Sequence, residues 1–310
     1  MHMTQAEWIA LGLFNIFVAV MMFIDLKWLH RENRPMRLRE ALGWTAFWVA
    51  LALVFCAGIW RFQGAEKGMQ FLAGYVLEES LSVDNLFVFL LVFSYFKVPA
   101  HAQHKVLFWG ILGALFLRAI FIFAGVALIH RFAWIMYIFG AFLIYSGSKL
   151  FFEQEKDVHP EHNPIVKFFK RLMPVTSDYE GENFFVWRNA RLWATPLFIV
   201  LIVIETTDII FAIDSIPAVL SVSNDPFIIY TSNIFAILGL RSLFFALSTV
   251  MKLFHYLHYG LGAILIFVGI KMCGAHFFHI SIGVSLGVIG TVLMFSVILS
   301  IIIGKKKHEI

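Results

Sequence analysis

The sequence predicts an all-α polytopic membrane protein with about nine transmembrane helices, six of which form an inverted 3+3 helix repeat. Three observations support this fold class: the composition, the spacing of the apolar runs, and an internal sequence match. Of the 310 residues, 60% are hydrophobic and 14% are charged. A soluble domain carries about 25% charged residues, so this chain has too few to cover a surface in water. Lipid is therefore the expected solvent.

Nine apolar runs reach or approach the roughly 20 residues that a helix needs to cross a bilayer. They are too long for the strands of a membrane barrel and lack the alternation of such strands, so helices are expected. The runs lie near 7–26, 41–60, 71–95, 105–127, 132–151, 192–220, 228–250, 256–274 and 281–303.

One long hydrophilic segment, 152–190, interrupts the apolar runs and carries charges of both signs. We expect a solvated cytoplasmic loop with a short amphipathic helix near 164–173. His159, Glu161 and His162 lie in this loop, and a metal-binding tract is the alternative interpretation of these three residues.

The charges of the connections predict the orientation of the chain, because cytoplasmic loops of membrane proteins carry an excess of Lys and Arg. The connections on one side hold eighteen Lys and Arg residues, and those on the other side hold four. The N-terminus is therefore expected outside and the C-terminus in the cytoplasm. The first residues lack the pattern of a secretory signal or a transit peptide, which favours a bacterial inner membrane.

The composition also argues against several functional classes. The net charge of +4 is spread over loops instead of lying on one face, which argues against a nucleic-acid partner. Cys56 and Cys273 are isolated in apolar runs, so neither a thiolate metal site nor a disulfide framework is expected. We find no nucleophile–base constellation and no metalloprotease motif, and we expect neither an enzyme nor a bound prosthetic group.

Two stretches of the chain match each other closely. Gly140–Lys149 reads GAFLIYSGSK and Gly262–Lys271 reads GAILIFVGIK, with six of ten positions identical. Arg118 and Arg241 precede these stretches by 22 and 21 residues, respectively. The same order and nearly the same spacing of Arg and the Gly-rich stretch, from Arg118 to Lys149 and from Arg241 to Lys271, indicate an internal duplication.

The duplication divides a single membrane domain, residues 1–310, into parts. The first repeat covers 71–151 and the second covers 192–274, and 281–310 supplies a last span and a basic tail. Each repeat holds three spans, and because three is odd, the second repeat enters the membrane from the opposite side. Inverted repeats are typical of secondary transporters, whose substrate sites lie near the middle of the bilayer. A duplication kept only for packing is the alternative.

Acidic residues lie inside the spans 71–95 and 192–220. Each charge at a helix centre costs about 2.5–3.5 kcal/mol, so such acids need water, protons or cations beside them. The acids are Glu78, Glu79, Asp84, Glu205, Asp208 and Asp214. The intramembrane cations Arg118 and Arg241 leave an excess of four negative charges. A divalent metal ion would neutralise much of this excess.

The side chains at this depth predict an all-oxygen metal site, which suits Mg²⁺, Ca²⁺ or Mn²⁺ without distinguishing among them. The expected ligands are Glu78, Asp84, Glu205, Asp208 and Asp214, with supporting or counter-ion roles for Asn85, Thr207, Ser215, Arg118, Arg241 and Asn233. Residues six apart on a helix lie about 120° from each other. Either the helices unwind locally, which Pro217 would favour, or the acids form successive stations along a path.

The acidic strings resemble those of the TerC family of membrane proteins, and the similarity extends over nearly the whole chain. The matching strings are Gly74–Asn85, Ile204–Ala218, Asp225–Phe227 and Thr231–Arg241. The chain is most similar to the Alx branch of alkali-inducible manganese exporters. The resemblance implies manganese efflux and, in some members, metalation of exported enzymes. It places the family's acidic motif on the five expected ligands, whereas Glu79 occupies a position that is not reliably acidic in relatives.

The leading hypothesis is therefore an inner-membrane exporter of a divalent cation, Mn²⁺, that works by alternating access. Proton exchange on the same carboxylates would couple export to the proton gradient, because burial makes the protonation of acids sensitive to their surroundings. A non-transporting membrane partner for the metalation or assembly of exported proteins is the main alternative. An amino-acid exporter would need a site less dominated by acids.

Overall fold

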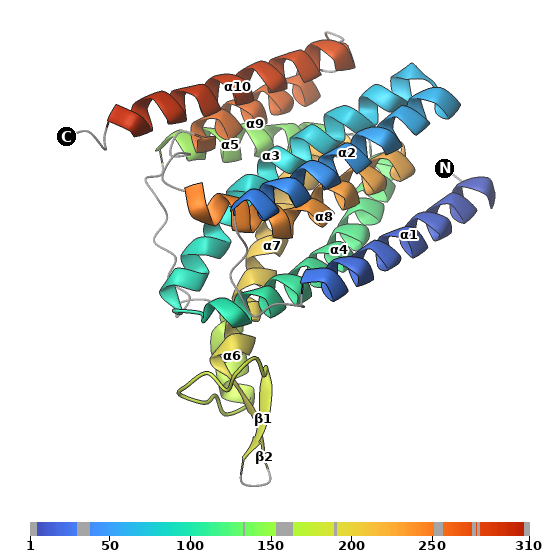
Figure 1. Cartoon of the computed structure of the whole chain (residues 1–310). Helices are drawn as coiled ribbons and strands as arrows, with labels where there is room; N and C mark the ends of the chain where they lie inside the picture. The colour runs from blue at the N-terminus through green and yellow to red at the C-terminus, as the bar shows by residue number, and fades with distance from the viewer. Residues whose placement is uncertain are drawn as a thin grey trace.

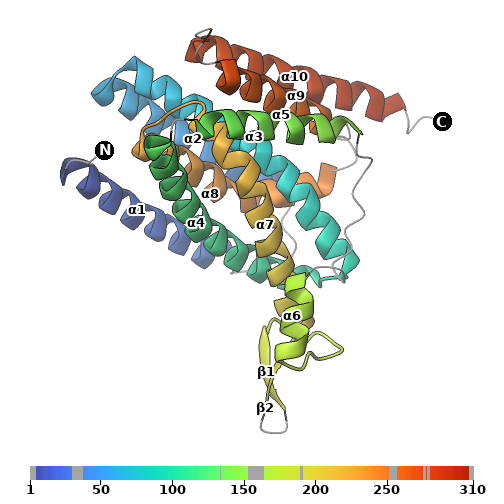
Figure 2. The same cartoon turned by 180° about the vertical axis from the view of Figure 1, so that it is seen from behind.

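A computed structural model of the chain describes residues 5–29, 38–132, 134–152, 164–188, 191–250, 257–274, 277 and 280–306. Within these residues the protein forms ten helices and one two-stranded sheet (Figures 1 and 2). The elements are α1 (Gln5–Leu29), α2 (Leu38–Gln63), α3 (Ala65–Tyr95), α4 (Ala100–Arg131), α5 (Ile135–Phe152), α6 (Pro164–Leu172), β1 (Phe185–Arg188), β2 (Arg191–Ala194), α7 (Pro196–Leu220), α8 (Pro226–Val250), α9 (Leu257–Gly274) and α10 (Ile282–Lys306).

Each of the nine predicted apolar runs is occupied by a helix. In the described part of the chain, five segments are long and apolar enough to cross a membrane: Leu38–Gln63, Ala100–Ile129, Pro196–Leu220, Pro226–Ser248 and Ile282–Ser300. Shorter apolar segments lie in α1, α5 and α9. The remaining long helix, α3, has 31 residues and carries several charged side chains.

Helix α8 lies at the centre of the molecule. It packs against α2, α3 and α4, and its most apolar stretch is almost entirely buried. The apolar side chains of α8 contribute to the two largest hydrophobic clusters, including Phe235 and Phe244, which are almost fully buried. In both views α1 and α10 lie at opposite edges of the bundle (Figures 1 and 2). The interior therefore belongs mainly to α3, α4, α7 and α8.

Helices α5 and α9 pack very closely against each other through four glycines. A Cβ atom on Gly147 would lie 2.6 Å from the carbonyl oxygen of Gly262, and one on Gly262 would lie 2.8 Å from that of Gly147. Gly140 and Gly269 make the same reciprocal contact, at 2.9 and 2.6 Å. The two helices therefore run antiparallel, with backbones in direct contact, as small residues permit in membrane helices.

The hydrophilic segment contains more structure than we predicted. The expected amphipathic helix is present as α6, but an antiparallel hairpin follows it, in which Phe185 pairs with Ala194 and Trp187 with Leu192. The predicted run at 192–220 therefore began too early. Leu192 and Trp193 belong to β2, and α7 begins at Pro196, a residue that favours the first position of a helix.

The unit formed by α6, β1 and β2 projects beyond one end of the helical bundle (Figure 1). It is attached by aromatic contacts, because the rings of Phe169 and Phe185 lie 5.6 and 4.5 Å from that of Phe198 at the start of α7. The Tyr179 hydroxyl donates a hydrogen bond of 2.8 Å to the carbonyl of Phe96 at the end of α3. The candidate metal-binding residues His159, Glu161 and His162 lie outside the described residues.

The acid-bearing helices α3 and α7 are both continuous. Helix α7 continues through Pro217 to Leu220, and α3 is helical from Ala65 to Tyr95. Local unwinding, one of the two expected ways of bringing the acids together, is therefore absent from both helices. The acids instead occupy positions on regular helices. Their role as successive stations along a path stays a prediction.

Candidate functional site

Four helices meet around a fully buried guanidinium group. Arg118 of α4 has no exposed surface, and it forms an ion pair with the Glu78 carboxylate of α3. Its Nη1 donates a hydrogen bond of 2.9 Å to Oδ1 of Asn233 in α8. Its Nη2 lies 3.9 Å from Oδ1 of Asp208 in α7. We name Glu78, Arg118, Asp208 and Asn233 the Arg118 cluster.

The Arg118 cluster joins the two halves of the sequence. Glu78 and Arg118 belong to the first predicted repeat, and Asp208 and Asn233 belong to the second. All four side chains are nearly or completely buried. Removing one partner from a buried ion pair costs roughly 3–5 kcal/mol, because it leaves the other charge uncompensated. The cluster is therefore a strong physical link between the halves.

Glu78 receives a second contact from its own helix. The hydroxyl of Ser82, one turn further along α3, donates to Oε1 of Glu78 at 3.3 Å. Oε2 of Glu78 has no hydrogen-bond donor among the described residues. Half of this carboxylate is thus available to another ligand.

Asp208 and Glu205 lie three residues apart on α7 and share a face of that helix. Asp208 is almost completely buried, and its Oδ2 has no hydrogen-bond partner within the described part of the chain. The Glu205 carboxylate packs directly against Gly113 of α4, where a Cβ atom would overlap it. Gly113 therefore creates the space that Glu205 occupies.

Several other polar atoms in this region lack partners. Among the described residues, Nδ2 of Asn85 and Oγ of Ser215 are buried without a hydrogen bond, as are Nε and Nη2 of Arg118. If Arg118, Glu78 and Asp208 are all ionised, the cluster also has one negative charge in excess. Orphaned polar atoms are costly in a dry interior, and they indicate that this region accepts a further polar group.

The remaining expected site residues lie in different places. The Thr207 hydroxyl donates to the carbonyl of Val203 in its own helix, at 2.7 Å. Asp84 and Asp214 belong to α3 and α7, but their side chains lie outside the described part of the structure. Among the described side chains, no three His, Cys, Asp or Glu residues lie close enough together to hold a metal ion.

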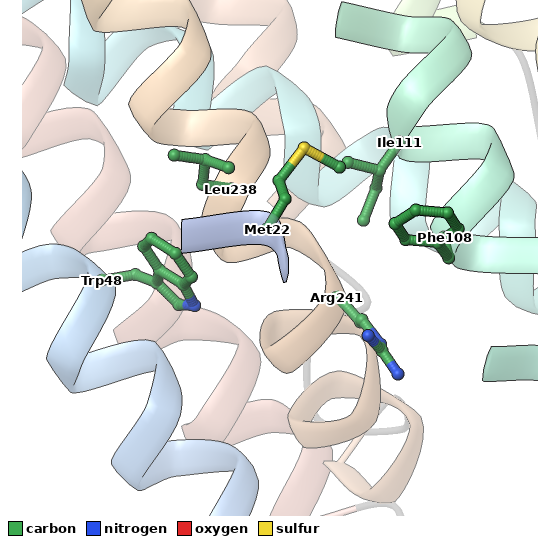
Figure 3. Close-up of a pocket in the computed structure, with 6 residues that line it drawn as sticks. All are labelled: Met22, Trp48, Phe108, Ile111, Leu238 and Arg241. Atoms are coloured by element: carbon green, nitrogen blue, oxygen red, sulfur yellow. The ribbon is translucent and has the colours of Figure 1, made fainter. Parts of the chain in front are cut away.

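Arg241, which matches Arg118 in the internal duplication, also contacts a neighbouring helix. Its Nη2 lies 3.3 Å from Nδ1 of His104 in α4. It also lines a pocket between α1, α2, α4 and α8, together with Met22, Trp48, Phe108, Ile111 and Leu238 (Figure 3). Apart from Arg241, the lining side chains are apolar or aromatic (Figure 3).

Glu79 lies apart from the described contacts of the Arg118 cluster. A Cβ atom on Gly239 of α8 would lie 3.9 Å from Oε1 of Glu79 and 3.7 Å from Cβ of Trp48. The carboxylate therefore lies between α3 and α8 near Trp48. Its Oε2 is buried without a hydrogen-bond partner among the described residues.

Sequence reasoning missed three residues that shape this region: Ser82, Gly113 and His104. Ser82 had a usable signal, since it follows Glu78 by four residues and so lies on the same helix face. Gly113 and His104 contact Glu205 and Arg241 across helices. No local spacing in a single sequence could have connected them.

Comparison with known proteins identifies the family. The model of the "Integral membrane protein TerC family" matches residues 63–308, which include the whole Arg118 cluster. The chain belongs to the TerC family. This confirms the resemblance found in the acidic strings, and it makes the chain a multi-pass integral membrane protein.

Relatives of this TerC protein match it over nearly their full lengths. A Myxococcus xanthus protein described as "Uncharacterized membrane protein STKORF319" is 50% identical over 295 residues, 95% of this chain and 92% of its own. The Escherichia coli (strain K12) protein named "Putative membrane-bound redox modulator Alx" is 45% identical over 298 residues, 93% of each chain. A protein of the same name from Photorhabdus laumondii is 44% identical over 305 residues, 96% of this chain and 95% of its own. No solved structure matches the chain.

Proposed function

We propose that this TerC protein is a divalent-cation transporter that exports Mn²⁺ across a bacterial inner membrane by alternating access. The observation that carries the proposal is the Arg118 cluster, where Glu78 and Asp208 from the two halves of the chain approach one buried cation. Intramembrane ionisable residues that face the interior of a helix bundle mark ion pathways in many membrane proteins. The N-terminus would lie outside and the C-terminus in the cytoplasm.

The packing of α5 and α9 supports the inverted repeat on which alternating access depends. The internal match aligns Gly140 with Gly262 and Gly147 with Gly269. Exchanging the two halves turns the contact between Gly140 and Gly269 into one between Gly262 and Gly147, and this second contact is present. A twofold axis between α5 and α9 would produce this reciprocity. Halves related in this way can rock against each other around a central site.

The donor atoms support a hard divalent ion as the substrate. Carboxylate and amide oxygens are the ligands that Mg²⁺, Ca²⁺ and Mn²⁺ prefer. Two of the five expected ligands, Glu78 and Asp208, meet at Arg118, and Glu205 lies one turn from Asp208 on α7. The remaining two, Asp84 and Asp214, lie on the same two helices. We propose that these five acids bind Mn²⁺ as the halves move, with Asn85, Ser215 and Asn233 beside them.

Transport of Mn²⁺ by purified protein in liposomes tests the proposal. Asp208→Asn and Asp214→Asn should each lower the rate of Mn²⁺ flux at least about tenfold, because each removes a proposed ligand. Glu66→Gln is the control, since Glu66 is an exposed acid in the first turn of α3. Flux that is absent in the wild type, or equal in all variants, would contradict the proposal.

One observation favours the second candidate function, a membrane partner for exported or metal-dependent proteins. The projecting unit exposes large apolar side chains, including Trp187, which is 75% exposed, Phe168 and Leu172. Exposed apolar groups of this kind are typical of contacts with other proteins. If Trp187→Ala leaves Mn²⁺ flux in liposomes unchanged but lowers the activity of exported manganese enzymes in cells, the unit serves such a partner.

The name of the relatives invites a comparison with thiol chemistry. The Cys56 thiol donates to the carbonyl of Gly68 in α3, and the Cys273 thiol donates to that of Tyr137 in α5. The two thiols are free and lie on different helices, α2 and α9. They do not form the paired dithiol that a thiol–disulfide switch requires. The intramembrane acids therefore support our proposal, and the cysteines do not.

A further inference from the structure

We propose that Arg118 is a tethered cation that holds the place of the transported metal ion and leaves it when the metal binds. This inference rests on the proposed function, and it adds that Arg118 competes with the metal ion for the proposed metal site. In the conformation described, the positive charge between Glu78 and Asp208 is supplied by the protein itself. Half of the negative charge of Glu78 and Asp208 is thereby balanced in the absence of cargo.

At the position between Glu78 and Asp208, the charges of these two acids favour exchange of Arg118 for a metal ion over occupation by both. With Arg118 in place, Glu78 and Asp208 carry one negative charge in excess, and adding a divalent ion would reverse this to one positive charge. Without Arg118, the same two acids and a divalent ion are neutral. A metal ion also needs carboxylate oxygens within about 2.0–2.6 Å, and the guanidinium contact occupies Oε1 of Glu78, so that only Oε2 of this acid is open to a metal ion while Arg118 is in place.

The way in which Arg118 is held also favours exchange. A guanidinium group offers five N–H donors, and a buried Arg with a purely structural role is expected to use most of them. Here Nη1 contacts Glu78 and Asn233, whereas Nε and Nη2 have no hydrogen-bond acceptor among the described residues. Nη2 is 3.9 Å from Asp208, too far for a hydrogen bond. Arg118 is therefore held mainly by the attraction between its charge and the two acids and by the contacts of a single nitrogen, Nη1.

A positive side chain that competes with the metal ion for the same acids would help the site to release the ion. Five acids around one divalent ion would bind it tightly, and a transporter needs a site from which the ion can leave. The return of Arg118 to Glu78 and Asp208 would displace the ion and reset the site. Removing the charge at position 118 should therefore strengthen Mn²⁺ binding and slow its turnover.

The first test measures Mn²⁺ binding to the purified full-length protein by titration calorimetry. Arg118→Gln should bind Mn²⁺ at least about tenfold more tightly than the wild type, while its flux in liposomes falls. Arg118→Lys, which keeps a positive charge, should stay within about threefold of the wild type. The control is Arg131→Gln, because Arg131 is an exposed Arg at the end of the same helix.

A pair of variants keeps the test decisive if Arg118→Gln does not fold. Glu78→Gln/Arg118→Gln removes both members of the closest buried pair and keeps the net charge of the Arg118 cluster at one negative, as in the wild type, which proteins tolerate better than the loss of one partner alone. It has the same acids as Glu78→Gln alone and differs only in lacking Arg118. The double variant should therefore bind Mn²⁺ more tightly than Glu78→Gln.

Chemical rescue separates a competing cation from a structural one. In Arg118→Ala, millimolar methylguanidinium should weaken Mn²⁺ binding, because it can refill the vacated position, whereas neutral methylurea should not. If instead Arg118 only supports the fold, methylguanidinium would strengthen binding or leave it unchanged. Wild-type protein that neither binds nor transports Mn²⁺ would overturn the proposed function itself. Wild-type binding combined with unchanged or weaker binding in the Arg118 variants would overturn only this inference.

Discussion

At the scale of single residues, the sequence predicts which charged side chains lie in the interior but not which residues contact them. Glu78, Asp208 and Arg118 could be predicted as interior groups, because charged residues within apolar runs are rare and costly. Their partners could not, since Asn233 lies 115 residues from Arg118 in sequence. The contact of Arg241 with His104 was equally hidden, because 137 residues separate the two in sequence.

Gly113 offers a test of the position of Glu205. Gly113→Ala places a Cβ atom where the Glu205 carboxylate lies, so the acid must move away from α4. We expect Mn²⁺ flux in liposomes to fall about 10–100-fold, as for other changes that displace a ligand without removing it. Gly43→Ala is the matched control, because a Cβ atom there meets nothing within 4 Å. Equal flux in both variants would separate Glu205 from the site.

At the scale of helices and strands, length and hydropathy were sufficient to predict the helices but not the hairpin. Each apolar run became a helix because a membrane leaves the backbone no other way to satisfy its hydrogen bonds. The hairpin was missed because Leu192 and Trp193 extend the apolar run that follows them, and their pairing with Val186 and Trp187 is a tertiary event. In the sequence, the only sign of the close approach of α5 and α9 is the pair of glycines that recurs in each repeat, Gly140 and Gly147 in the first and Gly262 and Gly269 in the second.

The α5–α9 contact predicts a stability effect. Gly147→Ala would bring a Cβ atom to 2.6 Å from the carbonyl of Gly262, so the helices must separate. Overpacking of this kind costs about 1–3 kcal/mol. We expect a lower midpoint of thermal unfolding in detergent for Gly147→Ala and for its counterpart Gly269→Ala. Gly290→Ala in α10 meets open space and should be neutral or slightly stabilising.

At the scale of the whole molecule, the chain is a helical body and a projecting unit that are joined by apolar contacts and hydrogen bonds. Tyr179 is one of these contacts, and it links the unit to the end of α3 through Phe96. Burial raises the pKa of the Tyr179 hydroxyl to about 12 from its ordinary value of 10.0. The neutral hydroxyl is therefore the form that the folded protein favours.

This pKa gives a pH dependence with a definite sign. Below about pH 10 Tyr179 is neutral in both the folded and unfolded protein, so its contribution to stability is fully present. Between about pH 10 and 12 the unfolded form ionises first, and the contribution is lost as the pH rises. Tyr179→Phe should cost about 0.5–1.5 kcal/mol at neutral pH. Thermal unfolding midpoints of the two proteins should differ up to about pH 10 and converge by about pH 12.

The enclosure of α8 has a consequence for biogenesis. Its counterparts α2, α4 and α10 present most of their surface outward, whereas α8 is covered by the rest of the body and carries Ser, Thr, Asn and Arg side chains. A newly made α8 would partition from the translocon into lipid inefficiently on its own. Packing against α2, α3 and α4, which are synthesised earlier, would cover its polar side chains. We therefore expect glycosylation mapping to show inefficient insertion of α8 alone and efficient insertion behind those three helices.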